Sequence, residues 1–155
     1  TRNAAIKVPC TRHVFYSDEI ESDAWDDDAF NKHVQQGISL GERMDKAFEQ
    51  VFALGASKAV IVGSDCPKIS SSLMNEAFEM LDEKDVIVGP AKDGGYYLLG
   101  MKETHSFLFN NKEWSTDSVF DDTVVDLIEN RLTYAKLTQL SDVDTIYDLH
   151  LLDGI

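Results

Sequence analysis

The sequence is poor in cysteine, in positive charge and in long apolar runs, and each shortage excludes a class of protein. The 155 residues contain 2 cysteines, Cys10 and Cys66, which is too few for a disulfide framework. No Cys-x-x-Cys pair or cysteine–histidine cluster predicts a zinc site. No apolar run approaches the roughly 20 residues needed to cross a bilayer. We therefore expect a cytoplasmic protein without a membrane segment.

Basic residues are outnumbered two to one by acidic residues. There are 14 Lys+Arg against 28 Asp+Glu, which gives a formal net charge of -14. Such a protein repels polyanions, so nucleic acid is not an expected partner. A small phosphate compound can still bind if a divalent cation neutralises both sides. The length of 155 residues and the hydrophobic share of 43% predict a single globular domain over residues 1–155.

Several common catalytic motifs are also absent. The sequence has no phosphate-binding Gly-x-x-x-x-Gly-Lys-Ser/Thr loop and no Gly-x-Gly-x-x-Gly fingerprint. It has no Gly-x-Ser-x-Gly nucleophile elbow. Cys66 follows Asp65, whose negative charge disfavours a thiolate, so this cysteine is a poor candidate nucleophile.

Short β-branched runs alternate with stretches of helical periodicity. Strands are expected at 12–16, 59–62, 86–88, 96–99 and 132–137, and helices near 40–51, 73–81, 120–128 and 145–152. This alternation predicts an α/β fold of three layers, with a mostly parallel sheet and helices on both faces. Residues 1–8 resemble the end of a helix that no strand precedes, so we expect the first βα unit of the fold to be missing. Ligands of such sheets bind at the carboxyl ends of the strands.

The segment Gly63-Ser64-Asp65-Cys66-Pro67 follows the predicted buried strand 59–62 directly. Glycine permits a turn, and proline forces the chain out of the sheet, so the Asp65 carboxylate is expected at the strand tip. Hard cations such as Mg²⁺ bind carboxylates at such positions. The alternative is that Asp65 caps the following helix, a task that the serines at 70–72 could also perform.

A glycine-rich segment follows the strand 86–88 and contains Asp93, Gly94 and Gly95. Paired glycines permit backbone conformations in which amide groups face a ligand. A tight hairpin turn is the alternative, since Asp-Gly favours hairpins. Tyr96 and Tyr97 should point to opposite faces of their strand, so one is expected in the core and the other can line a sugar or base pocket.

The segment before the first long helix has one explained part and one unexplained part. Ser39 and Glu42 match a capping box at the start of this helix. That pattern does not account for Gln36-Gly37, nor for Gly41 in the first helical turn, where glycine lowers helix stability and indicates a close approach. Arg43 could pair with an anion or lie in water.

Two later segments also carry polar side chains. Trp114 can act as a lid or a stacking ring, although core packing is the simpler interpretation. Ser115 or Thr116 is expected to cap the helix that follows. Asp144, in the segment 142–145, is a candidate second metal ligand, with helix capping by this segment as the alternative.

Taken together and in order, these segments resemble a bacterial family of small glycosyltransferase-A-like proteins. That family is linked in some members to arsenosugar biosynthesis and belongs to the nucleotide-diphospho-sugar transferase superfamily. Its distant relatives include the molybdenum cofactor guanylyltransferase and the 2-phospholactate guanylyltransferase. The match runs from residue 12 to about residue 150 and is carried by the segments 36–44, 63–67, 89–100, 114–116 and 142–145. The family also begins with a strand and a Gly-x-x-Lys-Thr-Arg loop that this sequence lacks.

The resemblance implies roles for individual residues. Asp65 and Asp144 would hold Mg²⁺ or Mn²⁺, and residues 93–96 would shape the acceptor or sugar pocket. Our own hypothesis, beyond the resemblance, is that Asp93 acts as a base on the acceptor side. The nucleotide would be bound by Gln36, Gly37, Gly41, Arg43, Gly63 and Ser64. The other substrate would be bound by Pro67, Gly94, Gly95, Tyr96, Trp114, Ser115 and Thr116.

The activity implied is that of a metal-dependent glycosyltransferase with a nucleotide-diphospho-sugar donor and a small-molecule acceptor. One alternative is a nucleotidyltransferase that joins a nucleoside triphosphate to a phosphorylated acceptor. The other is a non-catalytic binding protein of the same fold.

Overall fold

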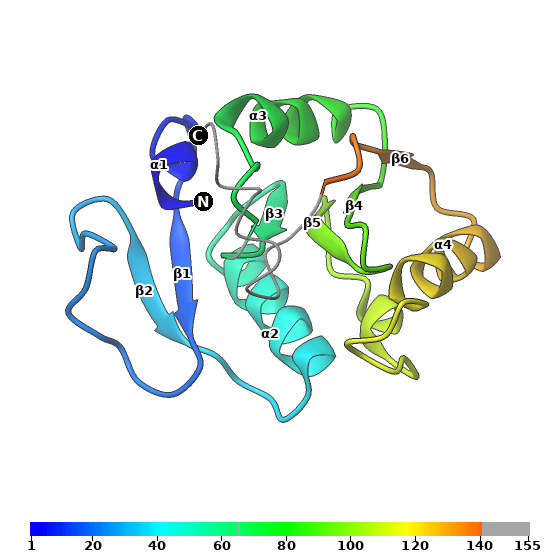
Figure 1. Cartoon of the computed structure of the whole chain (residues 1–155), viewed down its shortest axis with the longest axis horizontal. Helices are drawn as coiled ribbons and strands as arrows, with labels where there is room; N and C mark the ends of the chain where they lie inside the picture. Colours follow the sequence, from blue (N-terminus) through cyan, green and yellow to red (C-terminus); the bar gives the residue numbers. More distant parts are fainter. Residues whose placement is uncertain (65, 141–155) are drawn as a thin grey trace.

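The computed structural model describes residues 1–64 and 66–140, and its secondary structure follows the predicted alternation of strands and helices (Figure 1). In chain order the elements are α1 (Arg2–Ala5), β1 (His13–Tyr16), β2 (Asn31–Val34), α2 (Leu40–Ala53), β3 (Ala59–Val62), α3 (Ser71–Met80), β4 (Val86–Pro90), β5 (Tyr96–Met101), the 3₁₀ helix η1 (Ser106–Phe109), α4 (Val119–Glu129) and β6 (Tyr134–Lys136). The helix predicted near 145–152 lies outside the described residues.

The main sheet has four strands in the order β3-β5-β4-β6. Strands β4 and β6 pair in parallel, whereas β5 is antiparallel to both of its neighbours, β3 and β4. Strands β3, β4 and β6 therefore share one direction, and their carboxyl ends meet at one edge. A second, two-stranded parallel sheet is formed by β1 and β2. The predicted α/β class is confirmed, with β5 as the antiparallel member of the main sheet.

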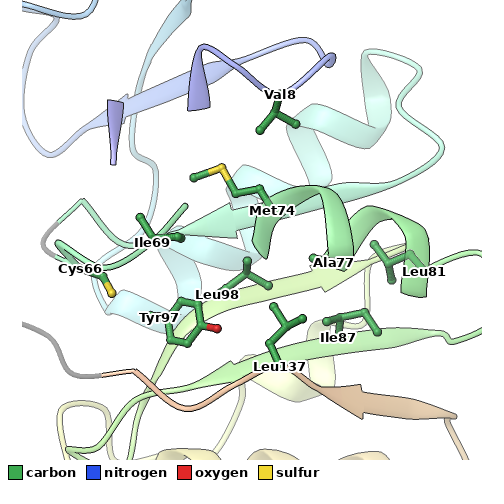
Figure 2. Close-up of a cluster of buried hydrophobic side chains, with 10 residues drawn as sticks. All are labelled: Val8, Cys66, Ile69, Met74, Ala77, Leu81, Ile87, Tyr97, Leu98 and Leu137. Atoms are coloured by element: carbon green, nitrogen blue, oxygen red, sulfur yellow. The ribbon is translucent and has the colours of Figure 1, made fainter. Parts of the chain in front are cut away.

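Helices cover both faces of the main sheet, as predicted. Period-two alternation sends Ile87 to one face and Val86 and Val88 to the other, and all three side chains are fully buried. The first face packs against α1 and α3. Figure 2 shows Met74 and Ala77 of α3, and Leu81 just after this helix, in one cluster with Ile87 and Leu98 of the strands. The second face packs against α2, η1 and α4. The three layers therefore enclose two apolar cores.

A β-bulge interrupts the pairing of β4 with β5 near the candidate site. Gly89 pairs with Leu98 and Pro90 pairs with Tyr96, so Tyr97 is the extra residue. Tyr97 is buried in the α3-side core, where its hydroxyl donates a hydrogen bond of 2.9 Å to the Thr138 carbonyl. Tyr96 packs on the opposite face. The prediction that the two tyrosines take opposite faces is therefore confirmed.

Local sequence signals account for the starts of α2 and α3 and for the end of α2. Ser39 caps α2 and Ser70 caps α3, each through a hydroxyl that accepts a backbone N–H hydrogen bond. Gly55, with φ at +97°, follows the last turn of α2. Within the part of the chain that is described, none of the helices has the length and apolar character that a bilayer span requires.

Candidate active site

The first part of the candidate site is the segment that follows β3. The Gly63 amide donates a hydrogen bond of 3.0 Å to the Tyr97 carbonyl, which holds this segment beside β5. The Thr1 hydroxyl lies 3.0 Å from the Gly63 carbonyl and 3.1 Å from that of Ser64, so it donates to both. Asp65 itself lies outside the described residues. Because Ser70 supplies the side-chain cap of α3, that helix does not depend on Asp65 for its cap.

The residues that flank Asp65 on its other side are well placed by the core. Cys66 is fully buried among apolar side chains of the α3-side core. Pro67 follows it in a turn and is half-buried. The chain therefore leaves the sheet after β3 between two anchored points, Gly63 and Cys66.

The loop 91–95 after β4 is a hairpin turn, which confirms the alternative interpretation of this segment. The Ala91 amide donates a hydrogen bond of 3.0 Å to the Gly95 carbonyl and so closes the turn. An Asp93 carboxylate oxygen accepts a hydrogen bond of 2.9 Å from the Gly95 amide. Asp93 is exposed and stabilises the turn. Its role as a base on the acceptor side stays a prediction.

Gly94 fixes this loop against the chain segment that leads into α4. Its φ is +91°, a conformation that side-chain-bearing residues rarely adopt. A methyl group at Gly94 would lie 2.1 Å from the Asp117 carbonyl oxygen and 2.4 Å from its Cα. The Gly94 carbonyl also accepts a hydrogen bond of 2.8 Å from the Phe120 amide. Gly94 is therefore required for the contact between the hairpin and the start of α4.

The amino end of α2 forms a second tight turn. The Ser39 hydroxyl accepts the Glu42 amide at 3.1 Å, and the Glu42 carboxylate accepts the Ile38 amide at 2.7 Å. This arrangement confirms the predicted capping of the helix. Gly37 has φ at +116°, and a methyl group there would lie 2.7 Å from the Glu42 Cβ. Arg43 donates to the Gly37 carbonyl at 3.2 Å, so its guanidinium stabilises the turn.

Gly41 brings the amino end of α2 into contact with Trp114. A methyl group at Gly41 would lie 2.5 Å from the indole Nε1 and 2.7 Å from the Phe109 carbonyl oxygen. The predicted close approach at Gly41 is therefore confirmed, and the approaching group is the Trp114 ring. That ring also stacks on Phe109 and meets Tyr96 edge to face, with both pairs of ring centroids 6.5 Å apart. These contacts favour the core-packing interpretation of Trp114.

Tyr96 ends in a hydroxyl group that is buried and has no hydrogen-bond partner among the described residues. Burial raises the pKa of this phenol above its ordinary value, so the hydroxyl remains protonated. Buried polar groups in folded proteins are nearly always hydrogen-bonded, to the protein itself or to a bound water or ligand. Tyr96 is thus the described residue of the candidate site with an unused hydrogen-bonding group.

The predicted cap of α4 at Ser115 or Thr116 is wrong. The N-cap of α4 is Ser118. Ser115 has φ at +65°, and the Thr116 hydroxyl donates to the Glu113 carbonyl at 2.7 Å, so both residues form the turn before the helix. The Thr116 hydroxyl is used within this turn and not at the first amides of α4. Neither candidate therefore caps the helix, which begins after Ser118.

Four of the five segments predicted to form the site are therefore partly or wholly described and are linked by direct contacts. Gly63 bonds to β5, Gly41 contacts Trp114, Trp114 contacts Tyr96, and Gly94 packs on Asp117. Gln36 is exposed beside them at the start of the α2 turn. The fifth segment, 142–145 with Asp144, lies outside the described residues.

The predicted metal ligands, Asp65 and Asp144, both fall outside the described part of the chain. Within residues 1–64 and 66–140, no group of three or more His, Cys, Asp or Glu side chains is arranged to hold a metal ion. The last described residue before the second candidate, Leu140, forms a parallel bridge with Ala91. The chain that leads to Asp144 therefore starts beside the hairpin loop.

Apart from Gly94, the residues that line a cavity beside the hairpin loop were given no site role in the sequence analysis. This cavity has a volume of about 500 Å³ and lies between the loop after β4, the start of α4 and the end of β6. Its lining includes Lys92 and Lys136. Lys92 belongs to the glycine-rich segment and carried a local signal, whereas Lys136 lies on a short edge strand and carried none.

The fold and the arrangement of these loops define the class of protein. The chain has the fold of a nucleotide-diphospho-sugar transferase. A crystal structure from Desulfovibrio desulfuricans G20, of a protein named "putative nucleotide-diphospho-sugar transferase", superposes with a TM-score of 0.89 at 30% sequence identity. The match covers 98% of this chain and 69% of that chain.

Residues 1–116 match the family described as "Uncharacterized protein conserved in bacteria (DUF2064)", and the chain belongs to this family. A search of curated proteins gave no match. The arsenosugar association implied by the sequence resemblance is not part of either finding.

Proposed function

We propose that this protein is a metal-dependent glycosyltransferase that uses a nucleotide-diphospho-sugar donor. The observation that carries the proposal is the convergence of three loops at the edge where β3 and β4 end. Gly63, Gly94 and Gly41 each place a different loop at or beside this edge. In open α/β sheets, this edge is where ligands bind. The name of the similar protein from Desulfovibrio desulfuricans supports the same substrate class.

Asp65 and Asp144 are the residues proposed to hold Mg²⁺ or Mn²⁺. Carboxylate oxygens are the ligands that both cations prefer. The cation would neutralise the negative charge of the donor diphosphate as it leaves. It would also allow a chain with a formal net charge of -14 to bind a diphosphate.

The amino end of α2 is proposed to face the nucleotide, and the hairpin loop to face the acceptor. Helix amino ends carry unpaired amide groups that favour negative ligands. Gly37 permits the turn before α2 to pack against Glu42, and Gly41 permits the first turn of α2 to pack against Trp114. The buried Tyr96 hydroxyl is a further group that a bound substrate or water would satisfy.

The test replaces Asp65 by asparagine and measures donor binding calorimetrically. A panel of nucleotide sugars is titrated with and without Mn²⁺ into the full-length protein and into Asp65→Asn. We expect the variant to lose the Mn²⁺-dependent part of the affinity, by about tenfold or more, which is about 1.4 kcal/mol. Asp28→Asn, in the exposed acidic loop, removes the same charge and should bind as the original protein does.

Unchanged Mn²⁺-dependent binding by Asp65→Asn would contradict the metal assignment. The reaction type is tested by the released product. A glycosyltransferase releases a nucleoside diphosphate, whereas release of pyrophosphate from a nucleoside triphosphate would show nucleotidyl transfer.

A further inference from the structure

The cavity beside Gly94 has the place and the size of a small-molecule site. Its volume of about 500 Å³ lies within the range of roughly 300–1,000 Å³ that is common for such sites. It opens where β4 and β6 end, so it shares the ligand-binding edge of the sheet. Its lining does not include Gly41 or Trp114, which lie in the contact between α2 and the segment before α4. The cavity is therefore a separate hollow that meets the candidate site at Gly94.

The walls of this cavity are held together by hydrogen bonds to the backbone. The Phe120 amide donates to the Gly94 carbonyl at 2.8 Å, which joins α4 to the hairpin loop. The Lys92 amide donates to the Leu140 carbonyl at 2.9 Å, which joins the loop to the chain after β6. The Gln139 side chain donates to the Ala91 carbonyl at 3.2 Å. These hydrogen bonds join α4, the hairpin loop and the chain after β6, three of the segments that line the cavity.

Two lysines line the cavity, and neither has an ion-pair partner in the part of the chain that the structure describes. Among the described residues, neither Lys92 nor Lys136 lies within 4.0 Å of a carboxylate oxygen. The described lysines that do form ion pairs are Lys32, Lys46, Lys58, Lys102 and Lys112. The Lys136 ammonium lies over the Phe120 ring, 5.8 Å from its centroid, which directs it toward the cavity wall formed by α4. In a chain with twice as many acidic as basic residues, two lysines on one cavity that pair with none of the described carboxylates favour an anionic ligand.

The same lining also contains the carboxylates of Asp117 and Asp121. These groups repel a bare anion, but a carboxylate accepts hydrogen bonds from hydroxyl groups. A ligand that satisfies both kinds of residue carries an anionic group for the lysines and hydroxyl groups for the aspartates. Phosphorylated sugars and phosphorylated hydroxy acids have this combination.

We infer that this cavity binds the acceptor, and that the acceptor is a small phosphorylated polyhydroxy compound. This inference rests on the proposed glycosyl transfer, because it names the substrate class for the acceptor side of that site. The phosphate is bound by Lys92 and Lys136, and the hydroxyl groups are bound by Asp117 and Asp121.

The experiment measures binding of glycerol 3-phosphate and glucose 6-phosphate to the full-length protein by calorimetry, without nucleotide or metal. Inorganic phosphate and uncharged glucose are the comparison ligands. We expect one of the phosphorylated polyols to bind with millimolar or better affinity, at least tenfold more tightly than either comparison ligand. Lys92→Gln/Lys136→Gln should weaken this binding at least tenfold.

Two further variants make the test specific. Lys7→Gln/Lys84→Gln removes the same charge at lysines that also lack ion pairs among the described residues but lie outside the cavity, and it should bind as the original protein does. Asp117→Ala/Asp121→Ala should reduce the preference for the phosphorylated polyol over inorganic phosphate, because it removes the acceptors for the polyol hydroxyl groups while relieving a repulsion that acts on both anions.

Equal affinities of the original protein and Lys92→Gln/Lys136→Gln would overturn the inference, as would equal affinities for inorganic phosphate and the phosphorylated polyols. The result is separable from the fate of the proposed function. Lysine-dependent binding of a phosphorylated polyol without any donor binding would leave this site standing and remove the glycosyltransferase. Donor binding without lysine-dependent polyol binding would support the glycosyltransferase and remove this acceptor site.

Discussion

Gly94 and Gly55 form a matched pair that measures how firmly the hairpin loop is held on the start of α4. Their φ values are +91° and +97°, so alanine at either position suffers a similar backbone strain. They differ in their surroundings. A methyl group at Gly94 would meet the Asp117 backbone at 2.1–2.5 Å, whereas nothing lies within 4 Å of one at Gly55.

The expected losses of stability follow from this difference. Left-handed backbone strain costs about 1–2 kcal/mol for alanine, which is the whole effect expected for Gly55→Ala. Gly94→Ala adds about 1–3 kcal/mol for overpacking against a backbone. It also adds about 1 kcal/mol if the Phe120–Gly94 hydrogen bond is lost. We therefore expect a loss of about 3–6 kcal/mol for Gly94→Ala.

Urea unfolding followed by circular dichroism measures the free energy of unfolding of both variants. The slope of this free energy against urea concentration checks two-state behaviour. Both variants should keep the slope of the original protein. The urea concentration at the unfolding midpoint should fall much further for Gly94→Ala than for Gly55→Ala. Equal losses for the two variants would refute the contact between the hairpin and Asp117, and with it the rigid wall of the cavity.

Three further predictions test other parts of the site. Gly41→Ala should lower the free energy of unfolding by about 1–2 kcal/mol, because the new methyl group clashes with the Trp114 ring. Adding Trp114→Phe to this variant should recover part of the loss. A Gly41→Ala variant more stable than the original protein would contradict the packing. In thermal unfolding without ligand, Tyr96→Phe should be as stable as the original protein or up to about 1 kcal/mol more stable, because it removes a buried hydroxyl with no partner among the described residues. A clear loss of stability would show that this hydroxyl has a hydrogen-bond partner. Burial and the neighbouring His33 lower the pKa of His13, so the free energy of unfolding has its full value above the ordinary histidine pKa of about 6.5 and falls as the pH drops below it. In His13→Asn the unfolding midpoint should depend less on pH between pH 7 and 5. A pH dependence equal to that of the original protein would refute this.

The sequence predicted those elements whose pattern is local. Strand β3 at Ala59–Val62 was predicted at its observed bounds, because a β-branched run between turn residues has few alternatives. The capping of α2 was predicted from Ser39 and Glu42, whose hydrogen bonds lie within one turn. Gly41 indicated a close approach, although its partner, Trp114, is distant in the sequence and could not be identified.

Several features that depend on distant partners were missed or left open. Strand β2, Asn31–Val34, has polar residues and partial exposure, and it forms because it pairs with β1. The direction of β5 follows from the hairpin at 91–95, which was one of two interpretations that the sequence allowed. Lys136 reaches the cavity through the parallel pairing of β6 with β4, which no local pattern encodes.

The edge where β3 and β4 end is proposed to bind a nucleotide sugar together with a divalent cation. The most direct test is a thermal-shift panel on the full-length protein, with nucleoside diphosphates, nucleoside triphosphates and nucleotide sugars, each with and without Mn²⁺. At a ligand concentration 100 times its Kd, binding raises stability by about 2.7 kcal/mol, which is a shift of several degrees. We predict a shift with one nucleotide sugar that requires Mn²⁺, and the absence of a shift with every nucleotide compound would contradict the proposed function.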